Sequence, residues 1–335
     1  MDKIPASSKK KIFLVFKHWR PRLSFLTLAG FVILLYGFIL YEAWYLHSLG
    51  GILVLIVLMS LMAALILEAN RDVFNHDHPF NLKSAMIAIG AVVVGAWATY
   101  EISHTLALGA VVASAVVGLM AAAIFPNHGA AIYCGSFVGM CSSSYLTGFH
   151  DLMVAALIAG MLFSISEDVF PGMGGKLGTI AFGGALLAGL SFRRQFVILP
   201  MPSAEVAWRI VLAATAATML TFWLSTRRNL GAVRASSLVG LLGGLLAPAI
   251  FPQIGEPLAV VVICASFTGM SSPERMPFPW MVLAAGLLTG IIFLYSFSIF
   301  GGAGGKLGTI AFGASLAVWG AREVFVKLKS LKSMQ

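Results

Sequence analysis

Two lysine and threonine pairs, each inside an identical ten-residue segment, are the first candidates for chemistry in this chain. The segment reads GGKLGTIAFG and occupies residues 174–183 and 304–313. It places Lys176 three residues before Thr179, and Lys306 three residues before Thr309. Because glycines precede each lysine and stop a helix, both lysines are expected in the first turn of a new helix, with the threonine on the same face. Free backbone N–H groups, an ammonium and a hydroxyl together suit a bound anion.

The same lysines allow a second interpretation. A lysine at a helix end can extend its charged group along lipid to a phosphate, and this needs no bound solute. Close packing of one helix start would also keep the Leu-Gly-Thr that follows each lysine unchanged. The spacing therefore predicts either an anion site or a packed helix start in both copies.

A second repeated motif, SFxGM, mixes a hydroxyl and a glycine within an apolar run. It makes Ser136, Gly139, Ser266 and Gly269 candidate solute contacts. Helices that break inside a membrane and line a cavity with their backbone have such a composition. The alternative is tight helix packing, because each glycine also completes a spacing of small residues four apart.

Two acidic residues interrupt the duplication and are candidates for ion coupling. Glu167 and Asp168 end the segment before Lys176, whereas Phe297 and Ser298 stand at the matching positions of the second copy. A carboxylate beside a membrane lysine can bind a proton or Na⁺, or can only neutralise the lysine.

Other polar clusters are weak signals. The run His76-Asp77-His78 lacks further ligands at metal-site spacing, and the three cysteines follow no zinc pattern, so no metal and no cofactor are expected. Phosphate-binding, metalloprotease and nucleophile-elbow motifs are also missing from the sequence. The adjacent His150 and Asp151 are the only support for an intramembrane enzyme, and we expect that the protein is not an enzyme.

The composition predicts a multi-pass membrane protein. The 335 residues are 59% hydrophobic and 10% charged, whereas soluble domains carry about 25% charged residues. The net charge of +9 does not imply nucleic acid, because basic residues gather in the amino-terminal arm, the short loops and the tail. Such flanks are typical of cytoplasmic segments that contact anionic lipid head groups.

The predicted fold is all-α, with about 12 transmembrane helices. Apolar runs that approach the ~20 residues of a spanning helix lie near 24–46, 50–69, 84–101, 105–124, 129–144, 151–170, 176–192, 205–225, 231–250, 256–272, 280–299 and 306–321. We divide the chain into a basic cytoplasmic arm (1–23), two leading helices (24–69), a first five-helix repeat (84–192), a second (205–321) and a basic cytoplasmic tail (322–335).

Four motifs recur in the same order in both copies, which indicates a duplicated unit. They are GAVxASxxVGL, AIFP, CxSFxGM and the decapeptide. Five crossings per copy would invert the second copy in the membrane, as in many secondary transporters, and basic residues then lie mainly inside. If the short SFxGM segments are instead re-entrant, each copy crosses four times and the copies are parallel. We favour inversion.

The topology resembles that of transporters with inverted five-helix repeats. We therefore expect a secondary transporter or facilitator for a small polar solute, with its site between the repeats. We expect this solute to be anionic. The alternative is a non-transporting membrane subunit or an intramembrane enzyme in which the motifs only pack helices. The expected location is the plasma (inner) membrane, with both termini cytoplasmic, and the expected partners are the solute, anionic lipid and, where the protein self-associates, a second copy of the chain.

Overall fold

The computed structural model describes residues 6–45, 49–71, 80–199 and 201–333, and these residues form an all-helical protein. The helices are α1 (Ala6–Tyr45), α2 (Leu49–Ala69), α3 (Leu82–His104), α4 (Ala110–Ile124), α5 (Gly129–Gly139), α6 (Phe149–Ile165), α7 (Lys176–Ser191), α8 (Ala204–Thr226), α9 (Ala232–Ile250), α10 (Gly255–Thr268), α11 (Pro279–Tyr295) and α12 (Lys306–Lys332). The predicted all-helical class is confirmed for this part of the chain. Each predicted apolar run overlaps one helix.

Six of these helices are long and apolar enough to cross a membrane. They are the apolar parts of α1 and α2, together with α3, α8, α9 and α12. The helices of the SFxGM motifs are much shorter, with 11 residues in α5 and 14 in α10. At 1.5 Å per residue neither reaches the ~30 Å of a bilayer core. The helix lengths therefore support a membrane protein, while a count of twelve crossings stays a prediction.

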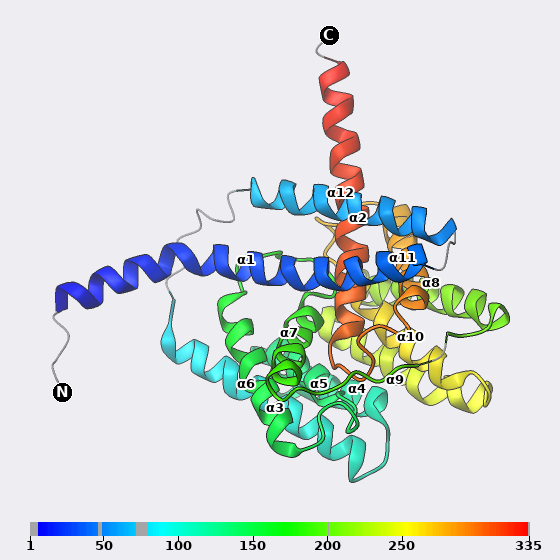
Figure 1. The fold of residues 1–335 in the computed structure, drawn as a ribbon, viewed down its shortest axis with the longest axis horizontal. Coiled ribbons are helices and arrows are strands. Elements are labelled where there is room, and N and C mark those ends of the chain that lie inside the picture. The colour runs from blue at the N-terminus through cyan, green and yellow to red at the C-terminus, as the bar shows by residue number, and fades with distance from the viewer. Residues whose placement is uncertain (1–5, 46–48, 72–79, 200, 334–335) are drawn as a thin grey trace.

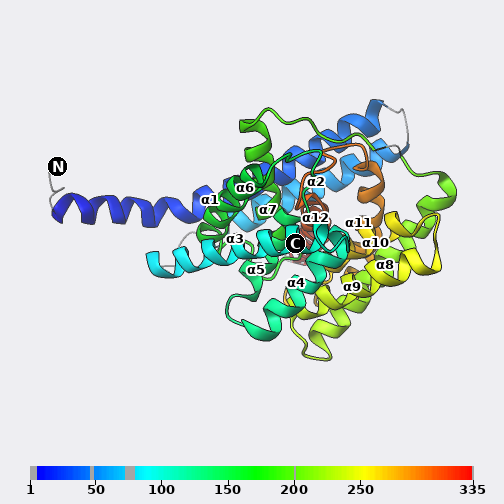
Figure 2. The same ribbon diagram turned by 90° about the horizontal axis from the view of Figure 1, so that it is seen from below.

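Two helices extend well beyond their predicted limits, by more than ten residues. The first helix begins at Ala6, within the predicted basic arm, and α12 continues to Lys332, through most of the predicted tail. Residues 321–332 contain neither glycine nor proline, so nothing in their sequence stops the helix. Figure 1 shows α1 and α2 lying side by side, with α12 crossing them steeply and its carboxyl-terminal part projecting from the body. Figure 2 shows the start of α1 projecting in a different direction.

The two copies of the duplicated sequence use the same helix neighbours. In the first copy α3 packs on α5 and α6, α4 on α5, and α6 on α7. In the second copy α8 packs on α10 and α11, α9 on α10, and α11 on α12. The copies also bind each other through matched loop contacts, because Ser142 N donates to Gly302 O at 2.9 Å and Ser272 N donates to Gly172 O at 2.8 Å.

The two decapeptides cross at the first turns of α7 and α12. A Cβ atom added to Gly178 would lie 2.5 Å from the Cα of Gly308, and one added to Gly308 would lie 2.4 Å from the Cα of Gly178. Each helix is preceded by a glycine in the left-handed region, with φ of 83° at Gly175 and 82° at Gly305. Glycine alone meets both demands without strain or collision. The identical segments therefore form one self-complementary contact.

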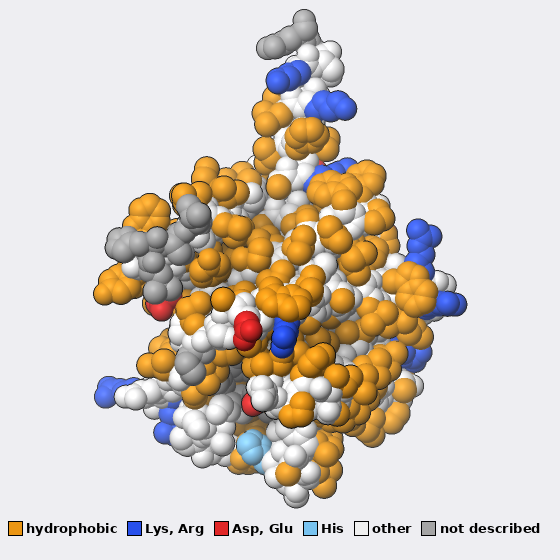
Figure 3. All heavy atoms as spheres, turned by 90° about the vertical axis from the view of Figure 1, so that its right-hand side faces the viewer, with side chains coloured by type: hydrophobic (Ala, Val, Ile, Leu, Met, Phe, Trp, Pro, Cys, Tyr) orange, Lys and Arg blue, Asp and Glu red, His pale blue; other side chains and the backbone are white. Residues whose placement is uncertain are grey.

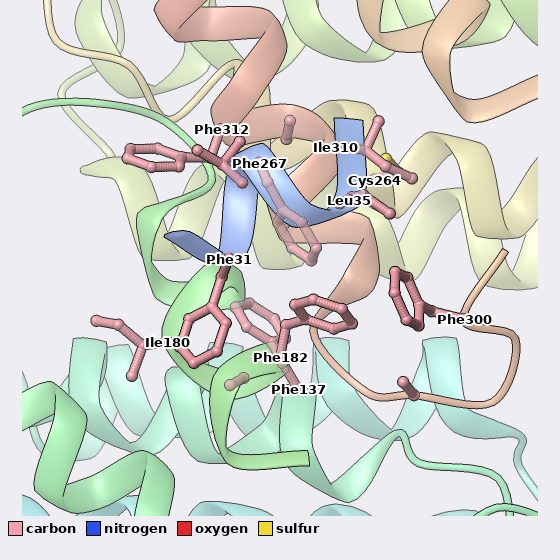
Figure 4. Packing of buried hydrophobic residues seen from close by; sticks show 14 of the residues in the cluster. Phe31, Leu35, Phe137, Ile180, Phe182, Cys264, Phe267, Phe300, Ile310 and Phe312 are labelled. Carbon is pink, nitrogen blue, oxygen red and sulfur yellow. The ribbon is translucent and has the colours of Figure 1, made fainter. Parts of the chain in front are cut away.

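The leading helix α1 covers this crossing. Tyr36 Oη donates to Ile310 O at 2.8 Å, and Phe31 packs edge-on against Phe182 at a ring distance of 6.4 Å. Figure 4 shows Phe31, Phe182 and Phe137 gathered on one side of this core, with Phe300 nearby. Figure 3 shows one face of the molecule that is covered largely by hydrophobic side chains. Such a surface suits lipid contact.

The crossing predicts a clear difference between two Gly→Ala variants. Gly178→Ala should lower the free energy of unfolding by about 1–3 kcal/mol, because its methyl group overpacks the contact with Gly308. Gly90→Ala in α3 is the matched control, since a Cβ there meets nothing within 4 Å. The control should be neutral or slightly stabilising. Thermal unfolding in detergent checks this, and a Gly178→Ala protein that melts at or above the wild-type temperature would contradict the crossing.

Candidate functional site

Two cavities lie at the starts of α7 and α12. The α7 cavity has a volume of about 450 Å³ and includes Gly175, Lys176 and Leu177 in its lining. The α12 cavity has a volume of about 370 Å³ and includes Gly305, Lys306 and Leu307. These are the matching residues of the repeated segment. The duplicated sequence therefore produces two related cavities, and each is large enough for a small molecule.

Both copies contribute to each cavity. The α7 cavity is closed from the second copy by Ala232 and Val233, at the start of α9. The α12 cavity is closed from the first copy by Ala110 and Val111, which are the matching residues of α4. A relative movement of the two copies would therefore change both cavities at once.

An aromatic pair separates the two cavities. Phe137 of α5 and Phe267 of α10 line both of them, and their ring centroids are 4.5 Å apart. Their side chains are almost fully buried, and Tyr133 packs against Phe137 at 4.4 Å. Figure 4 shows both phenylalanines within the central core. They belong to the SFxGM motif, whose serine and glycine were predicted as solute contacts while the phenylalanine between them was overlooked.

The two lysines line the cavities, and their ammonium groups bind the ends of the preceding helices. Lys176 Nζ donates to the backbone oxygen of Glu167 at 3.1 Å. Lys306 Nζ donates to the oxygens of Ser296 and Ile299, both at 2.7 Å. Each lysine therefore caps backbone carbonyls beyond α6 or α11, where the helix dipole is negative. This capping role is compatible with an anion site and with a packed helix start.

The predicted threonines and serines lie in helix contacts. Thr179 and Thr309 are fully buried, and each hydroxyl lies 3.4 Å from the backbone oxygen of the glycine four residues earlier. Ser136 Oγ lies 2.8 Å from Ser114 Oγ, and Ser266 Oγ lies 2.8 Å from Ser236 Oγ. None of these four side chains belongs to the lining of either cavity.

The two predicted glycines also lie in close helix contacts. A Cβ added to Gly139 would lie 2.5 Å from Ala96 O, and one added to Gly269 would lie 2.5 Å from Thr218 O. These contacts join α5 to α3 and α10 to α8. Of the SFxGM residues, the phenylalanine and the methionine are the ones that reach the cavities.

The two predicted coupling acids have different surroundings. Asp168 forms an ion pair with the buried Arg20 of α1. Glu167 is exposed, and it lines both the α7 cavity and a small polar pocket of about 210 Å³ that also contains Asp168. The structure thus neutralises the charge of Asp168 and leaves Glu167 beside the cavity.

The remaining candidates do not form a reactive site in the described residues. Asp151 is held by Arg194 at 2.7 Å, while His150 is 80% exposed and its Nδ1 lies 3.9 Å from Asp151. The run of His76, Asp77 and His78 lies outside the described residues. In the part of the chain that the structure describes, no three His, Cys, Asp or Glu side chains are grouped to hold a metal ion.

A buried ion pair beside the α7 cavity was not predicted. Arg275 binds Glu68 of α2 through two hydrogen bonds of 2.6 and 2.8 Å, and both side chains are buried. Arg275 Nε also donates to Pro171 O at 2.9 Å. The pair therefore ties a leading helix to the segment before α7. The sequence signal for this ion pair is that Glu68 and Arg275 are charged residues next to apolar runs.

The lysine geometry predicts unequal effects of removing each charge. Lys306→Met should lower the free energy of unfolding by about 3 kcal/mol, because two buried carbonyls lose a charged donor. Lys176→Met should cost less, since Lys176 is less buried and makes one longer bond. Methionine preserves the apolar stem in both variants. Equal melting temperatures of the two purified variants would contradict the predicted difference, and a Lys306→Met protein that melts at the wild-type temperature would show that its capping contacts are not stabilising.

Comparisons with known proteins give no relative from which to transfer a function: no protein-family model matches the chain, and no curated protein or solved structure is similar to it.

Proposed function

We propose that the protein is a secondary transporter or facilitator for a small polar solute that is anionic at neutral pH. The observation that carries this proposal is the pair of related cavities on the two sides of the Phe137 and Phe267 pair. In alternating access, one site is exposed in turn to each side of the membrane by movement of one repeat against the other. Two cavities separated by one aromatic pair support this proposal, because a movement of that pair would join them.

The proposed architecture is two leading helices followed by two inverted five-helix repeats, residues 84–192 and 205–321. The matched helix neighbours support it. So does the direction of the first helix of each copy, because α3 and α8 run in opposite directions across the molecule (Figures 1 and 2). Under inversion the two cavities face opposite sides of the membrane. The basic residues then favour cytoplasmic termini in a plasma (inner) membrane.

An anionic solute is proposed from the charge of the cavity walls. At the helix start, each cavity contains a lysine and the positive end of the helix dipole, and its lining also includes one acidic residue, Glu256 in the α12 cavity and Glu167 in the α7 cavity. The backbone contacts of the ammonium groups hold this charge in place. The proposed solute contacts are therefore Lys176 and Lys306, with the buried Thr179, Thr309, Ser136, Gly139, Ser266 and Gly269 supporting the helices that carry the site.

A second candidate function is a non-transporting membrane subunit. It is favoured by the engagement of the repeated serines, threonines and glycines in helix contacts. The two candidates differ in what the cavities do, because a packing scaffold does not need them to be open.

Filling either cavity distinguishes transport from packing. Val233→Trp fills the α7 cavity and Val111→Trp fills the α12 cavity, whereas Val94→Trp is the control at a position that is 53% exposed. Uptake of a panel of labelled small anions into proteoliposomes should fall at least tenfold in both cavity variants and stay unchanged in the control. Melting temperatures verify folding. Unimpaired uptake in a folded cavity variant would oppose a route through that cavity, and no uptake of any solute by wild type would favour the subunit.

Inversion predicts that matching loops lie on opposite sides of the membrane. Leu106, after α3, and Arg228, after α8, are exposed and occupy equivalent positions in the two copies. Single cysteines at these positions, in a protein whose three native cysteines are replaced, should react with an impermeant maleimide from opposite sides. With the amino terminus inside, position 106 should label from outside. Labelling of both positions from the same side would favour parallel repeats.

The position of Glu167 predicts a coupling role that Asp168 does not share. Glu167→Gln should uncouple solute accumulation from a pH gradient while solute binding stays measurable. Asp168→Asn should mainly lower stability, because an ion pair with the buried Arg20 is lost. Uptake driven by an imposed pH gradient, together with thermal unfolding, checks both. Full pH-driven accumulation in both variants would make the two carboxylates structural.

A further inference from the structure

The two cavities differ at a pair of matching serines. Ser166 and Ser296 follow the last residues of α6 and α11 at equivalent positions. Ser296 Oγ donates to Phe293 O at 2.9 Å. Ser166 is only 1% exposed, and its hydroxyl has no hydrogen-bond partner among the described residues. A buried hydroxyl without a partner costs about 1–3 kcal/mol, so its retention points to a partner outside the chain.

Ser166 differs from the other buried hydroxyls that lack a partner. Those groups are Thr99, Thr221 and Ser237, and none of them lines either cavity. Ser166 lines the α7 cavity. A molecule in this cavity could therefore supply the missing partner.

A second polar group lines the same cavity. Lys176 Nζ binds the backbone oxygen of Glu167, the residue after Ser166, and this is its one hydrogen bond within the described part of the chain. Lys306, its counterpart, gives two shorter bonds to carbonyls. An ammonium has three N–H donors, so Lys176 can bind a further acceptor. The α7 cavity thus offers an unpaired hydroxyl and an ammonium with two free donors, whereas in the α12 cavity the serine is engaged and the ammonium has one free donor.

Apart from Ser166, Lys176 and the exposed Glu167, the side chains that line the α7 cavity are apolar. Its wall includes Phe163, Phe170, Ile180 and Phe267. A dianion such as sulfate would place hydrated oxygens against these side chains without hydrogen-bond partners, which is unfavourable. A monocarboxylate has two oxygens on one end and an apolar body on the other. This distribution matches the cavity.

Resting on the proposed transport function, we propose that the α7 cavity binds a soluble monocarboxylate with a compact apolar body. Its carboxylate accepts hydrogen bonds from Ser166 Oγ and Lys176 Nζ. The apolar body packs against the phenylalanine wall. The α12 cavity is the passage on the other side of the barrier, where Lys306 contacts the solute in transit without the second donor that Ser166 supplies in the α7 cavity.

Equilibrium binding of labelled benzoate to purified protein in detergent tests this site. Ser166→Ala should weaken benzoate binding about tenfold to a hundredfold, since a hydrogen bond to a charged group is lost. Ser296→Ala is the matched control and should change affinity less than twofold. Ser166→Ala should melt no lower than wild type, because it removes an unpaired hydroxyl. Benzamide, which has the same shape without the charge, should not compete.

Three outcomes would overturn the proposal. They are the absence of saturable benzoate binding to wild type, an unchanged affinity in folded Ser166→Ala, and equal losses in Ser166→Ala and Ser296→Ala. Palmitate in the same assay separates a soluble solute from a membrane fatty acid, because preferential displacement by palmitate would reject the soluble one. If benzoate binding depends on Ser166 but no solute is taken up into proteoliposomes, the site is retained and transport is refuted. If solute is taken up but Ser166→Ala binds benzoate with unchanged affinity, transport is retained and the site is refuted.

Discussion

The contact between Gly178 and Gly308 constrains the rest of the structure. It brings the first turns of α7 and α12 together at backbone distance, and a methyl group on either residue would collide with the other helix. Because the contact is self-complementary, both segments must meet the same steric requirement. This requirement accounts for glycines in both copies of the decapeptide. It also fixes the positions of the two lysines, and hence the position of the ammonium group in each cavity.

The sequence could predict the helices and the importance of the duplicated motifs. Apolar runs between glycine and proline stops define most helix positions, and glycines before Lys176 and Lys306 correctly predict helix starts. The fate of each side chain could not be predicted in this way. Lys306 binds carbonyls at the end of α11, and Ser136 binds Ser114, through contacts that depend on how separate helices pack. A repeated motif shows that a position is constrained, and only the residues that contact it in the fold show which interaction imposes the constraint.

The same limit explains why the cavity residues were partly missed. Phe137 and Phe267 carry no polar atom, so within an apolar run they resemble any packed side chain. Their role arises from their shared position between two cavities. The ion pair of Arg275 and Glu68 was missed for a related reason, since its partners are 207 residues apart in the chain. Pairing of distant charges is a property of the fold.

The unduplicated helices make the two halves unequal. Arg20 of α1 and Glu68 of α2 form ion pairs with Asp168 and with Arg275, and Arg275 also binds Pro171, so charged contacts hold the segment before α7. Both segments pack a phenylalanine against α1, since Phe170 stacks on Phe25 at 5.0 Å and Phe300 packs against Phe38 at 5.2 Å. Among the described residues, the segment before α12 has no ion pair with a leading helix. Apolar contacts can slide with little loss of energy, whereas a buried ion pair loses much when it separates. In the proposed transporter, aromatic contacts join the leading helices to both sides, while ion pairs are added on the α7 side, so a movement of the α12 side would cost less energy. The α7 side is also where the unpaired hydroxyl of Ser166 lies.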